Sequence, residues 1–425
     1  MKAKSKDKPS REYTCPYCFA TVDLDRIHYQ CSSPGCAREF ASRASSTRSR
    51  DAEKYVSADG RNEIDYEKCL IYNKDPRGPD AIVAKNHIIR DSSGTCDICG
   101  RPAYIRLCPF CNSQIPPGAE EDGNRIFVIL GPKSVGKSHY TAVLINQLKE
   151  VVSKEFNCIL NPATDETTMK YRDVYYHRLF EEMYKLRPTA SYETSVESKE
   201  PLIYYLRVFE GERPLVYTFA FFDTAGEDLV TLERMTSLSL NSFIAKASGI
   251  VYLVDPLQVP FINRRINMEA KPAVGPDASD ILNNICQIIR RNKGLRSGAR
   301  IDIPIAVTLT KTDVLMKNPE NEEEDKVVIG ACSSLHIPRE NGKYDEENSE
   351  QIDAELEEYI RRTMGNNFLQ IVSGFKEHRF FAVSALGCNP VSERLPRGVA
   401  PFRVEDPFLW LMHIWNDEDQ GRDRR

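Results

Sequence analysis

The chain has 425 residues, which is room for one large domain and a smaller one. Apolar residues make up 41% and charged residues 28% of it, as in globular proteins. No apolar run reaches the ~18 residues that a membrane span needs, and no apolar stretch follows the basic N-terminus as a secretory signal would require. We therefore expect a cytoplasmic protein. The net charge is −5, and residues 1–118 carry a surplus of basic residues while the remainder is acidic.

Eight of the thirteen cysteines form four close pairs in the first quarter of the chain. Cysteines two to four residues apart match the geometry of a tetrahedral zinc site, and a reducing compartment disfavours disulfides. The four pairs predict about two Zn²⁺ ions, each in a Cys₄ site. Pairing in sequence order is our prediction, and cross-pairing of the outer and inner pairs is the alternative. The predicted ligands are Cys15, Cys18, Cys31, Cys36, Cys96, Cys99, Cys108 and Cys111.

Between the inner pairs, the Ser/Arg-rich run that begins at Ala41 is predicted to be flexible or exposed. The stretches 63–73 and 80–90 alternate in polarity and are predicted to be strands. A proline- and glycine-bearing linker over 113–124 ends this zinc-ribbon module, predicted at 1–112. Such a module docks a protein partner or a nucleic acid, and its small basic surplus does not favour nucleic acid.

The segment 131–138, GPKSVGKS, follows the apolar strand 125–130 and precedes a predicted helix. It matches the phosphate-binding pattern G-x-x-x-x-G-K-[ST] at every position. Glycines let backbone N–H groups curl around a phosphate, the lysine reaches the outer phosphates, and the serine hydroxyl can bind Mg²⁺. The predicted nucleotide-binding residues here are Gly131, Pro132, Lys133, Ser134, Val135, Gly136, Lys137, Ser138 and His139.

A predicted antiparallel pair of strands, 202–209 and 216–223, ends in the sequence DTAG. Asp223 at the strand end can hold Mg²⁺, usually through water, and Gly226 can donate its backbone N–H to the third phosphate. The polar segment before these strands, helical in its middle third, lies where a nucleotide switch would contact that phosphate.

Two further apolar runs, 249–255 and 303–310, predict buried strands, and the second leads into the sequence TKTD. Asp313 can accept hydrogen bonds from the ring N–H and the amine of guanine, and the stem of Lys311 can cover the base. The strand FFAVSAL can supply backbone N–H groups to the guanine oxygen. The predicted base-reading residues are Thr310, Lys311, Asp313, Ser384, Ala385 and Leu386.

The rest of the C-terminal region is less informative. Residues 317–350 are rich in Asp and Glu and are predicted to form a mobile surface insert. A helix is expected over 351–364, an irregular arm over 389–407, and a last helix that docks Trp410 and Trp415 on the sheet.

The motifs GPKSVGKS, DTAG, TKTD and SAL, in this order, resemble the G domain of P-loop GTPases of the Ras-like and translation-factor-like class. The whole-chain plan also resembles the zinc-ribbon-bearing double-GTPase proteins of prokaryotic conflict systems. The fold that follows is α/β: a six-stranded, mostly parallel sheet with helices on both faces, over 125–425, with insertions near 161–200, 256–278 and 316–350. The resemblance implies GTP/GDP and Mg²⁺ as cofactors, with Ser138, Asp223 and a switch threonine serving the metal.

Three residues depart from the Ras-like pattern. Lys133 stands where Ras-like proteins have glycine, and Glu227 stands where they have the glutamine that orients water. Thr189 is the predicted switch threonine, with Thr194 as the alternative. Arg187 resembles the arginine that G-protein α subunits supply in cis, although a solvated surface arginine is the simpler interpretation. The predicted catalytic residues are thus Lys137, Glu227, Thr189 and Arg187.

Two functions follow from these patterns. The first is a GTP-hydrolysing switch, slow without a partner, whose zinc ribbons dock a protein or nucleic acid in a prokaryotic defence system. The second is a zinc-ribbon interaction platform that binds GTP structurally and scarcely hydrolyses it; Lys133 and Glu227 favour it.

Overall fold

The computed structural model describes residues 12–47, 53–115, 125–153, 157–187, 201–209, 215–221, 243–268, 271–272, 274–296, 298–338 and 344–423. The chain divides into two compact units, Met1–Asn124 and Arg125–Arg425, which we call the N-terminal and the C-terminal unit. No helix of the described residues combines the length and the apolar character that crossing a membrane requires.

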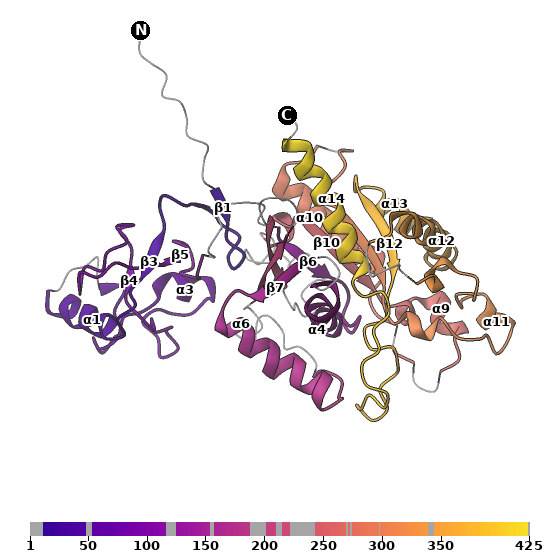
Figure 1. Ribbon diagram of the computed structural model, residues 1–425, viewed down its shortest axis with the longest axis horizontal. Coiled ribbons are helices and arrows are strands. Elements are labelled where there is room, and N and C mark those ends of the chain that lie inside the picture. The colour runs from indigo at the N-terminus through magenta and orange to yellow at the C-terminus, as the bar shows by residue number, and fades with distance from the viewer. Residues whose placement is uncertain are drawn as a thin grey trace, which may run out of the picture. The chain divides into compact units, whose positions relative to one another are not determined.

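The described part of the N-terminal unit contains short strands and the helices α1 (Cys36–Thr47) and α3 (Tyr66–Ile71) (Figure 1). One sheet is the hairpin of β1 (Glu12–Thr14) and β2 (Thr21–Asp23), and the other has the antiparallel order β4-β3-β5. In the second sheet β3 is His28–Gln30, β4 is Ile88–Ile89 and β5 is Ile105–Leu107. Because β5 pairs with β3, the beginning and the end of this unit meet.

One prediction for the N-terminal unit is right in part and another is wrong. The Ser/Arg-rich run is exposed at Ser42, Arg43, Ser45 and Ser46, as predicted, but its described part is not flexible chain: it is helical up to Thr47, because Ala41 and Ala44 lie on one face and are buried together with Val56. The stretch 63–73 is not a strand but contains α3, whose first turn is capped by the side chain of Asp65, which accepts from the backbone N–H of Lys68 at 3.0 Å.

The C-terminal unit contains a parallel sheet with the order β12-β11-β10-β6. These strands are β6 (Phe127–Leu130), β10 (Gly249–Val254), β11 (Ile305–Leu309) and β12 (His378–Ala382). A second, antiparallel sheet has the order β7-β8-β9, formed by Cys158–Pro162, Leu202–Val208 and Leu215–Phe221. The structure thus has two sheets where the sequence predicted one sheet of six strands. Among the described residues no ladder joins β9 to β6, although Phe221 contacts Phe127 with ring centroids 5.5 Å apart.

The described helices of the C-terminal unit are interspersed with its strands. They are α4 (Lys137–Gln147), α6 (Asp165–Lys170), α9 (Pro260–Arg265), α10 (Ala278–Lys293), α11 (Glu322–Asp325), α12 (Glu346–Met364), α13 (Asn366–Val372) and α14 (Asp406–Asp423). The alternation is not strict, since β8 is followed directly by β9 and α11, α12 and α13 come in succession. Two π-helical segments, η1 (Leu148–Val152) and η2 (Tyr171–Glu181), continue α4 and α6, and short 3₁₀ turns lie at η5 (Pro256–Gln258), η6 (Thr312–Val314) and η7 (Ser334–His336).

Helices cover both faces of the parallel sheet, as predicted. Along β10, Val251 and Leu253 belong to the core that includes α4 and α14, while Tyr252 points the other way and donates its hydroxyl to the carbonyl of Ala278 in α10 at 2.7 Å. Figure 1 shows α14 crossing the sheet near β10. Helix α14 packs so closely there that a Cβ at Gly249 would lie 2.8 Å from the ring of Trp415. The prediction that the last helix docks on the sheet is confirmed.

The prediction of a mobile surface insert over 317–350 is right in part: most of its described residues are exposed, but several side chains anchor it to the core. Glu324 and Val327 are fully buried, and Tyr359 of α12 donates its hydroxyl to the carbonyl of Val327 at 2.7 Å. This insert is packed because α11 places the carboxylate of Glu324 against groups that donate hydrogen bonds to it.

Candidate functional site: a phosphate loop and two cysteine clusters

The predicted phosphate loop joins β6 to α4. A Cβ at Gly131 would lie 2.6 Å from the carbonyl oxygen of Leu253, so the close approach to β10 requires glycine. Ser134 and Gly136 both have positive φ, 64° and 96°, which turns the backbone before the helix begins at Lys137. Ser138 is the second residue of α4, and its helix N-terminus favours an anion.

Lys137 lies folded across its own loop. Its side chain is buried, and its Nζ donates to the carbonyl oxygens of Gly131 and Pro132, each at 2.9 Å. Val135 is fully buried and anchors the loop, since its carbonyl accepts from the Thr310 hydroxyl at 3.0 Å. Lys133 is exposed. The conformation of the loop is therefore maintained by residues that the sequence predicts to bind the phosphates and to recognise the base.

The TKTD segment follows β11 and lies against the loop. Lys311 has a left-handed backbone, with φ 52°, and its Nζ reaches the carbonyl of Ser134 at 3.2 Å and the carboxylate of Asp255 at 2.6 Å. The Asp255 side chain is fully buried and also accepts from the backbone N–H of Leu257 at 2.9 Å. Thr312 is buried, and its hydroxyl donates to the carbonyl of Val383 at 2.9 Å.

Asp313 and Ser384 meet directly. The Ser384 hydroxyl donates to the Asp313 carboxylate at 2.6 Å and accepts from the backbone N–H of Gly387 at 3.0 Å. Ala385 and Leu386 are half-buried against the core. The parallel register, with Val254, Leu309 and Ala382 in line, places these motifs at one edge of the sheet. A carboxylate, a lysine and loop N–H groups at this edge can bind a charged, hydrogen-bonding ligand.

His139 was predicted to be part of the nucleotide-binding residues, and the structure gives it a specific partner. Its Nε2 accepts from the backbone N–H of Leu186 at 3.0 Å. Burial, together with the nearby Lys311 and Lys185, lowers the pKa of His139 to about 4. The ring is therefore neutral at physiological pH and acts as an acceptor.

Several predicted residues lie outside the described part of the chain. These are Asp223, Gly226, Glu227, Thr189 and the alternative Thr194. Arg187 is described and exposed, directly after the buried Leu186. Asp255 had no predicted role, although an acid at the end of the apolar run 249–254 was the signal that could have indicated one.

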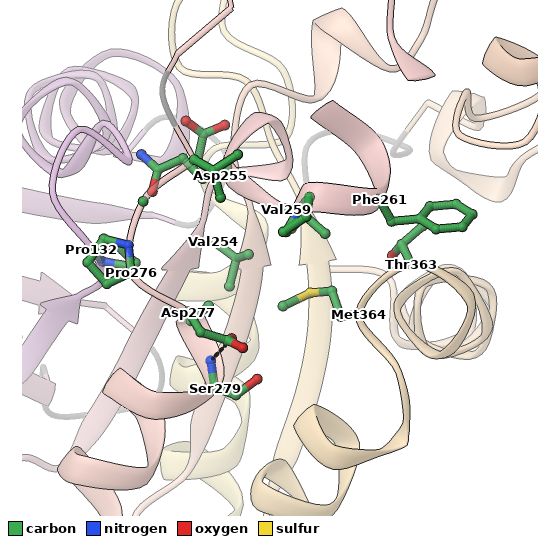
Figure 2. A pocket seen from close by; sticks show the side chains of 15 residues that line it. Pro132, Val254, Asp255, Val259, Phe261, Pro276, Asp277, Ser279, Thr363 and Met364 are labelled. Carbon is green, nitrogen blue, oxygen red and sulfur yellow. Dashed lines mark hydrogen bonds between the residues drawn. The ribbon is translucent and has the colours of Figure 1, made fainter. Parts of the chain in front are cut away.

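A cavity of about 340 Å³ lies behind the phosphate loop, where Pro132 forms part of its wall (Figure 2). The segment 254–261, the start of α10 and the end of α12 form most of the remainder. Gln258 links this cavity to the loop, because its Nε2 donates to the carbonyl of Lys133 at 2.8 Å.

The eight paired cysteines form two clusters in the N-terminal unit, but not in the predicted sequential pairing. The outer cluster is Cys15, Cys18, Cys108 and Cys111, and the inner cluster is Cys31, Cys36, Cys96 and Cys99. Sequential pairing is wrong because β5 runs antiparallel along β3, from the inner cluster to the outer one. His28 lies opposite Leu107, which directly precedes Cys108, and Gln30 lies opposite Ile105.

Three of the four cysteine pairs share one turn geometry. In each, the backbone N–H four residues after the first cysteine donates to that cysteine's carbonyl at 2.8 Å, from Phe19, Gly100 and Asn112. These three residues all have positive φ, between 51° and 68°. The fourth pair differs, since Cys36 opens α1.

The sulfur positions fit zinc. Sulfur–sulfur distances are 3.7 Å for Cys15–Cys111 and Cys18–Cys108, and 3.8 Å for Cys31–Cys99. A tetrahedral ion with Zn–S bonds of about 2.3 Å has edges of about 3.8 Å, whereas a disulfide bond is about 2.0 Å long. Each cluster could therefore hold one zinc ion.

Two thiols of the inner cluster have pKa values that are shifted in opposite directions. The backbone N–H of Arg101 lowers the pKa of Cys99 to about 7, and burial raises the pKa of Cys36 to about 12. A bound cation favours the thiolate of both.

A buried polar network connects the two clusters. Beside the inner one, His87 Nε2 bonds to Asp97 at 2.7 Å and its Nδ1 bonds to Glu63 at 2.8 Å. Arg90 donates to both Glu63 and Glu67 at 3.1 Å. Beside the outer cluster, Asn112 donates to Glu67 at 2.7 Å. The segment between the inner pairs thus supports both clusters from one hydrogen-bonded core.

Comparison with known proteins gives one curated relative and several solved structures. No protein-family model matches the chain. The "Putative ESX-1 scaffolding and assembly protein SaeC" of Mycolicibacterium smegmatis is 29% identical over 323 residues, covering 72% of this chain and 79% of that protein.

Among the similar solved structures are P-loop GTPases. The signal recognition particle receptor complex SRb-GTP/SRX of Chaetomium thermophilum has a TM-score of 0.29 at 12% identity, over 64% of this chain and 95% of that one. The small GTPase Arl6 of Trypanosoma brucei has a TM-score of 0.27 at 13% identity, over 69% of this chain and 97% of that one. The GTPase-like domain of S. cerevisiae Ski7 has a TM-score of 0.28 at 14% identity, over 69% of this chain and 50% of that one.

Proposed function

We propose that the C-terminal unit binds GTP with Mg²⁺ at the carboxyl edge of its parallel sheet and hydrolyses it slowly. The observation that carries this proposal is the meeting of three motifs there. Asp313 is held by Ser384 at 2.6 Å, and Lys311 reaches the phosphate loop at Ser134. A carboxylate that faces the base and a lysine that braces the loop are what recognition of guanine needs.

Each residue then has a role. Lys137 would leave the two loop carbonyls for the outer phosphates, which replace them as acceptors. Ser138, Asp223 and Thr189 would hold Mg²⁺, which neutralises charge on the phosphates when bound. Glu227 would orient or deprotonate the attacking water, and Arg187 would stabilise the charge that develops in the transition state.

We further propose that the cysteine-bearing N-terminal unit holds two zinc ions and docks a partner. A protein is the favoured partner and a nucleic acid the alternative. The resemblance of the chain plan to double-GTPase proteins of conflict systems supports a switch role in defence.

The specific alternative is a scaffold that binds GTP without turnover. The name of the M. smegmatis relative, an ESX-1 scaffolding and assembly protein, supports this alternative. So does the long cation Lys133 in the loop, where it would lie near the third phosphate.

Nucleotide binding and turnover test the proposal. Purified protein with Mg²⁺ is titrated with fluorescent GTP and ATP, and phosphate release is followed over many turnovers. We expect GTP to bind at least ~100-fold more tightly than ATP, as in sites built around a specific hydrogen bond. Lys137→Ala should abolish this binding, and Lys376→Ala, an exposed lysine at the opposite end of β12, should not. Equal affinity for ATP would overturn the guanine assignment, and tight GTP binding without phosphate release would favour the scaffold.

A further inference from the structure

The chain between β12 and α14 forms an arm, residues 387–402, that starts at the base-reading end of the site. At its root Ser384 and Phe402 exchange two backbone hydrogen bonds, of 3.0 and 2.8 Å, and the N–H of Ala400 donates to Leu386 at 3.0 Å. Gly387 has a φ of 71°, and a Cβ there would lie 2.0 Å from the carbonyl of Ala400. Only glycine fits where the arm leaves the Ser384 segment.

The tip of the arm contacts the segment 183–187, which ends at Arg187. The N–H of Leu395 donates to the carbonyl of Met183 at 2.7 Å, and the N–H of Lys185 donates to the carbonyl of Glu393 at 2.8 Å. The Arg394 guanidinium donates to the hydroxyl of Tyr184 at 2.7 Å. The tip therefore pairs with this segment in an antiparallel manner, through backbone and side chain together.

The same segment is held on its other side by the phosphate-loop helix and by η2. His139 accepts from the N–H of Leu186 at 3.0 Å, and Arg178 donates to the carbonyl of Lys185 at 2.8 Å. Leu186 and Leu395 are both buried. Segment 183–187 thus lies between α4, the helix that follows the phosphate loop, and the arm, whose root pairs with Ser384. Figure 1 shows this arm, in yellow, near the end of the helix that begins as α6.

We propose that this arm couples occupancy of the guanine site to the position of Arg187, with Arg394 as a positioning residue. The inference rests on the proposed function. A base held by Asp313 and Ser384 would fix the root of the arm, and the tip would then fix the peptide immediately before Arg187. A loop that served only to connect β12 to α14 would need none of the three contacts at its tip.

Two readouts test the coupling in the full-length protein: amide hydrogen exchange at 183–187 and the single-turnover rate of GTP hydrolysis. In wild type, GTP should slow exchange at Lys185 and Leu186. In Arg394→Ala this slowing should be lost, and the rate should fall ~10-fold or more while GTP affinity stays within about threefold. Arg187→Ala sets the upper limit of the effect, because moving Arg187 out of position cannot lower the hydrolysis rate more than removing its side chain does.

Arg397→Ala is the matched control, because Arg397 is an exposed arginine of the same arm. Tyr184→Phe removes the same hydrogen bond but keeps the ring beneath the Arg394 guanidinium, so it should show the same loss to a smaller or equal extent, and the double variant should be no worse than Arg394→Ala. A variant with 391–394 replaced by two glycines removes the whole tip and should behave at least as severely. The coupling is refuted, while the proposed function stands, if wild type binds GTP but the exchange rate at 183–187 does not change. The same holds if Arg394→Ala behaves like Arg397→Ala. Absence of GTP binding would overturn the proposed function and the coupling with it.

Discussion

At the scale of single residues, Asp255 fixes part of the candidate site through two hydrogen bonds. Its buried carboxylate accepts hydrogen bonds from Lys311 at 2.6 Å and from the backbone N–H of Leu257. It therefore fixes the position of the lysine and caps the turn η5 that follows β10. A buried charge of this kind is stable only while its partner remains. Lys311 is thus oriented before any ligand arrives, which lowers the entropy cost of binding.

Base specificity at Asp313 is the first prediction. Asp313→Asn keeps an oxygen that can accept from Ser384, so the local structure should survive. The new amide N–H₂ meets the guanine amine, donor against donor, and GTP affinity should fall by ~100-fold. Xanthine carries an oxygen at that position, so the variant should prefer XTP over GTP. Affinities for GTP, XTP and ATP measure this, with the exposed Asp325→Asn as control; an unchanged preference for GTP would contradict the role of Asp313.

Single residues were predictable from the sequence where a motif names them. The turn of the phosphate loop follows from its glycines, and the placement of Asp313 and Ser384 at the carboxyl ends of neighbouring strands follows from the motifs that contain them, although their direct hydrogen bond does not. The contacts of His139 and Asp255 did not follow, because their partners, Leu186 and Lys311, lie 47 and 56 positions away and no pattern connects them.

At the scale of elements, helix α11 is held by one buried acid. Glu324 accepts from Lys317 at 2.6 Å, from the N–H of Asn267 at 2.6 Å and from the N–H of Glu320 at 2.8 Å. Burial by itself raises the pKa of Glu324, but these donors outweigh it and lower that pKa to about 2. The two insertions of the C-terminal unit, near 256–278 and 316–350, are therefore joined by an ionised carboxylate.

The stability contributed by Glu324 should depend on pH. Its folded pKa of about 2 lies below its ordinary value of 4.5, so the stabilisation is full above pH 4.5 and is lost as the pH falls towards 2. Glu324→Gln should lower the free energy of unfolding by roughly 2 kcal/mol at pH 7. That difference should shrink below pH 4.5.

Urea denaturation at several pH values, with the exposed Glu322→Gln as control, measures the effect. A difference between wild type and Glu324→Gln that stays constant from pH 7 to pH 3 would show that the charge of Glu324 does not stabilise the insert.

Elements with a strong apolar pattern were predicted correctly, and so was the charged helix over 351–364, which is part of α12, but two other polar helices were not predicted. Strands β10 and β11 are fully buried and were clear as continuous apolar runs. The polar helices α1 and α11 were missed, because each is stabilised by distant partners, Val56 for α1 and Asn267 for α11, rather than by its own pattern.

At the scale of the whole molecule, the two units divide the proposed chemistry. The N-terminal unit carries both cysteine clusters, and the C-terminal unit carries the phosphate loop and the TKTD and SAL segments. The sequence predicted this division from cysteine spacing and the linker. It could not predict the pairing of the clusters, because that depends on the register of β3 with β5.

Zinc content is the prediction at this scale. Protein purified without chelator should contain about two zinc ions per chain, and Cys96→Ser should reduce this to about one, because it removes a ligand of the inner cluster only. Thermal unfolding of the variant should begin at a lower temperature. Elemental analysis and calorimetry measure both, with the exposed Cys332→Ser as control. Protein without zinc whose thiols are oxidised to disulfides would contradict the assignment.

The nested pairing of the cysteines also sets an order of assembly along the chain. The outer cluster joins Cys18 to Cys108 across 90 positions, and the inner cluster, which joins Cys31 to Cys99 across 68, lies wholly inside that loop. Once the inner ring has closed, the path that remains for the outer ring is about fourfold shorter, which lowers its closure cost by about 1 kcal/mol. We expect the inner ring, which is the shorter of the two, to close first, and the outer ring cannot be complete before Cys111, the last of the eight sulfurs, has left the ribosome.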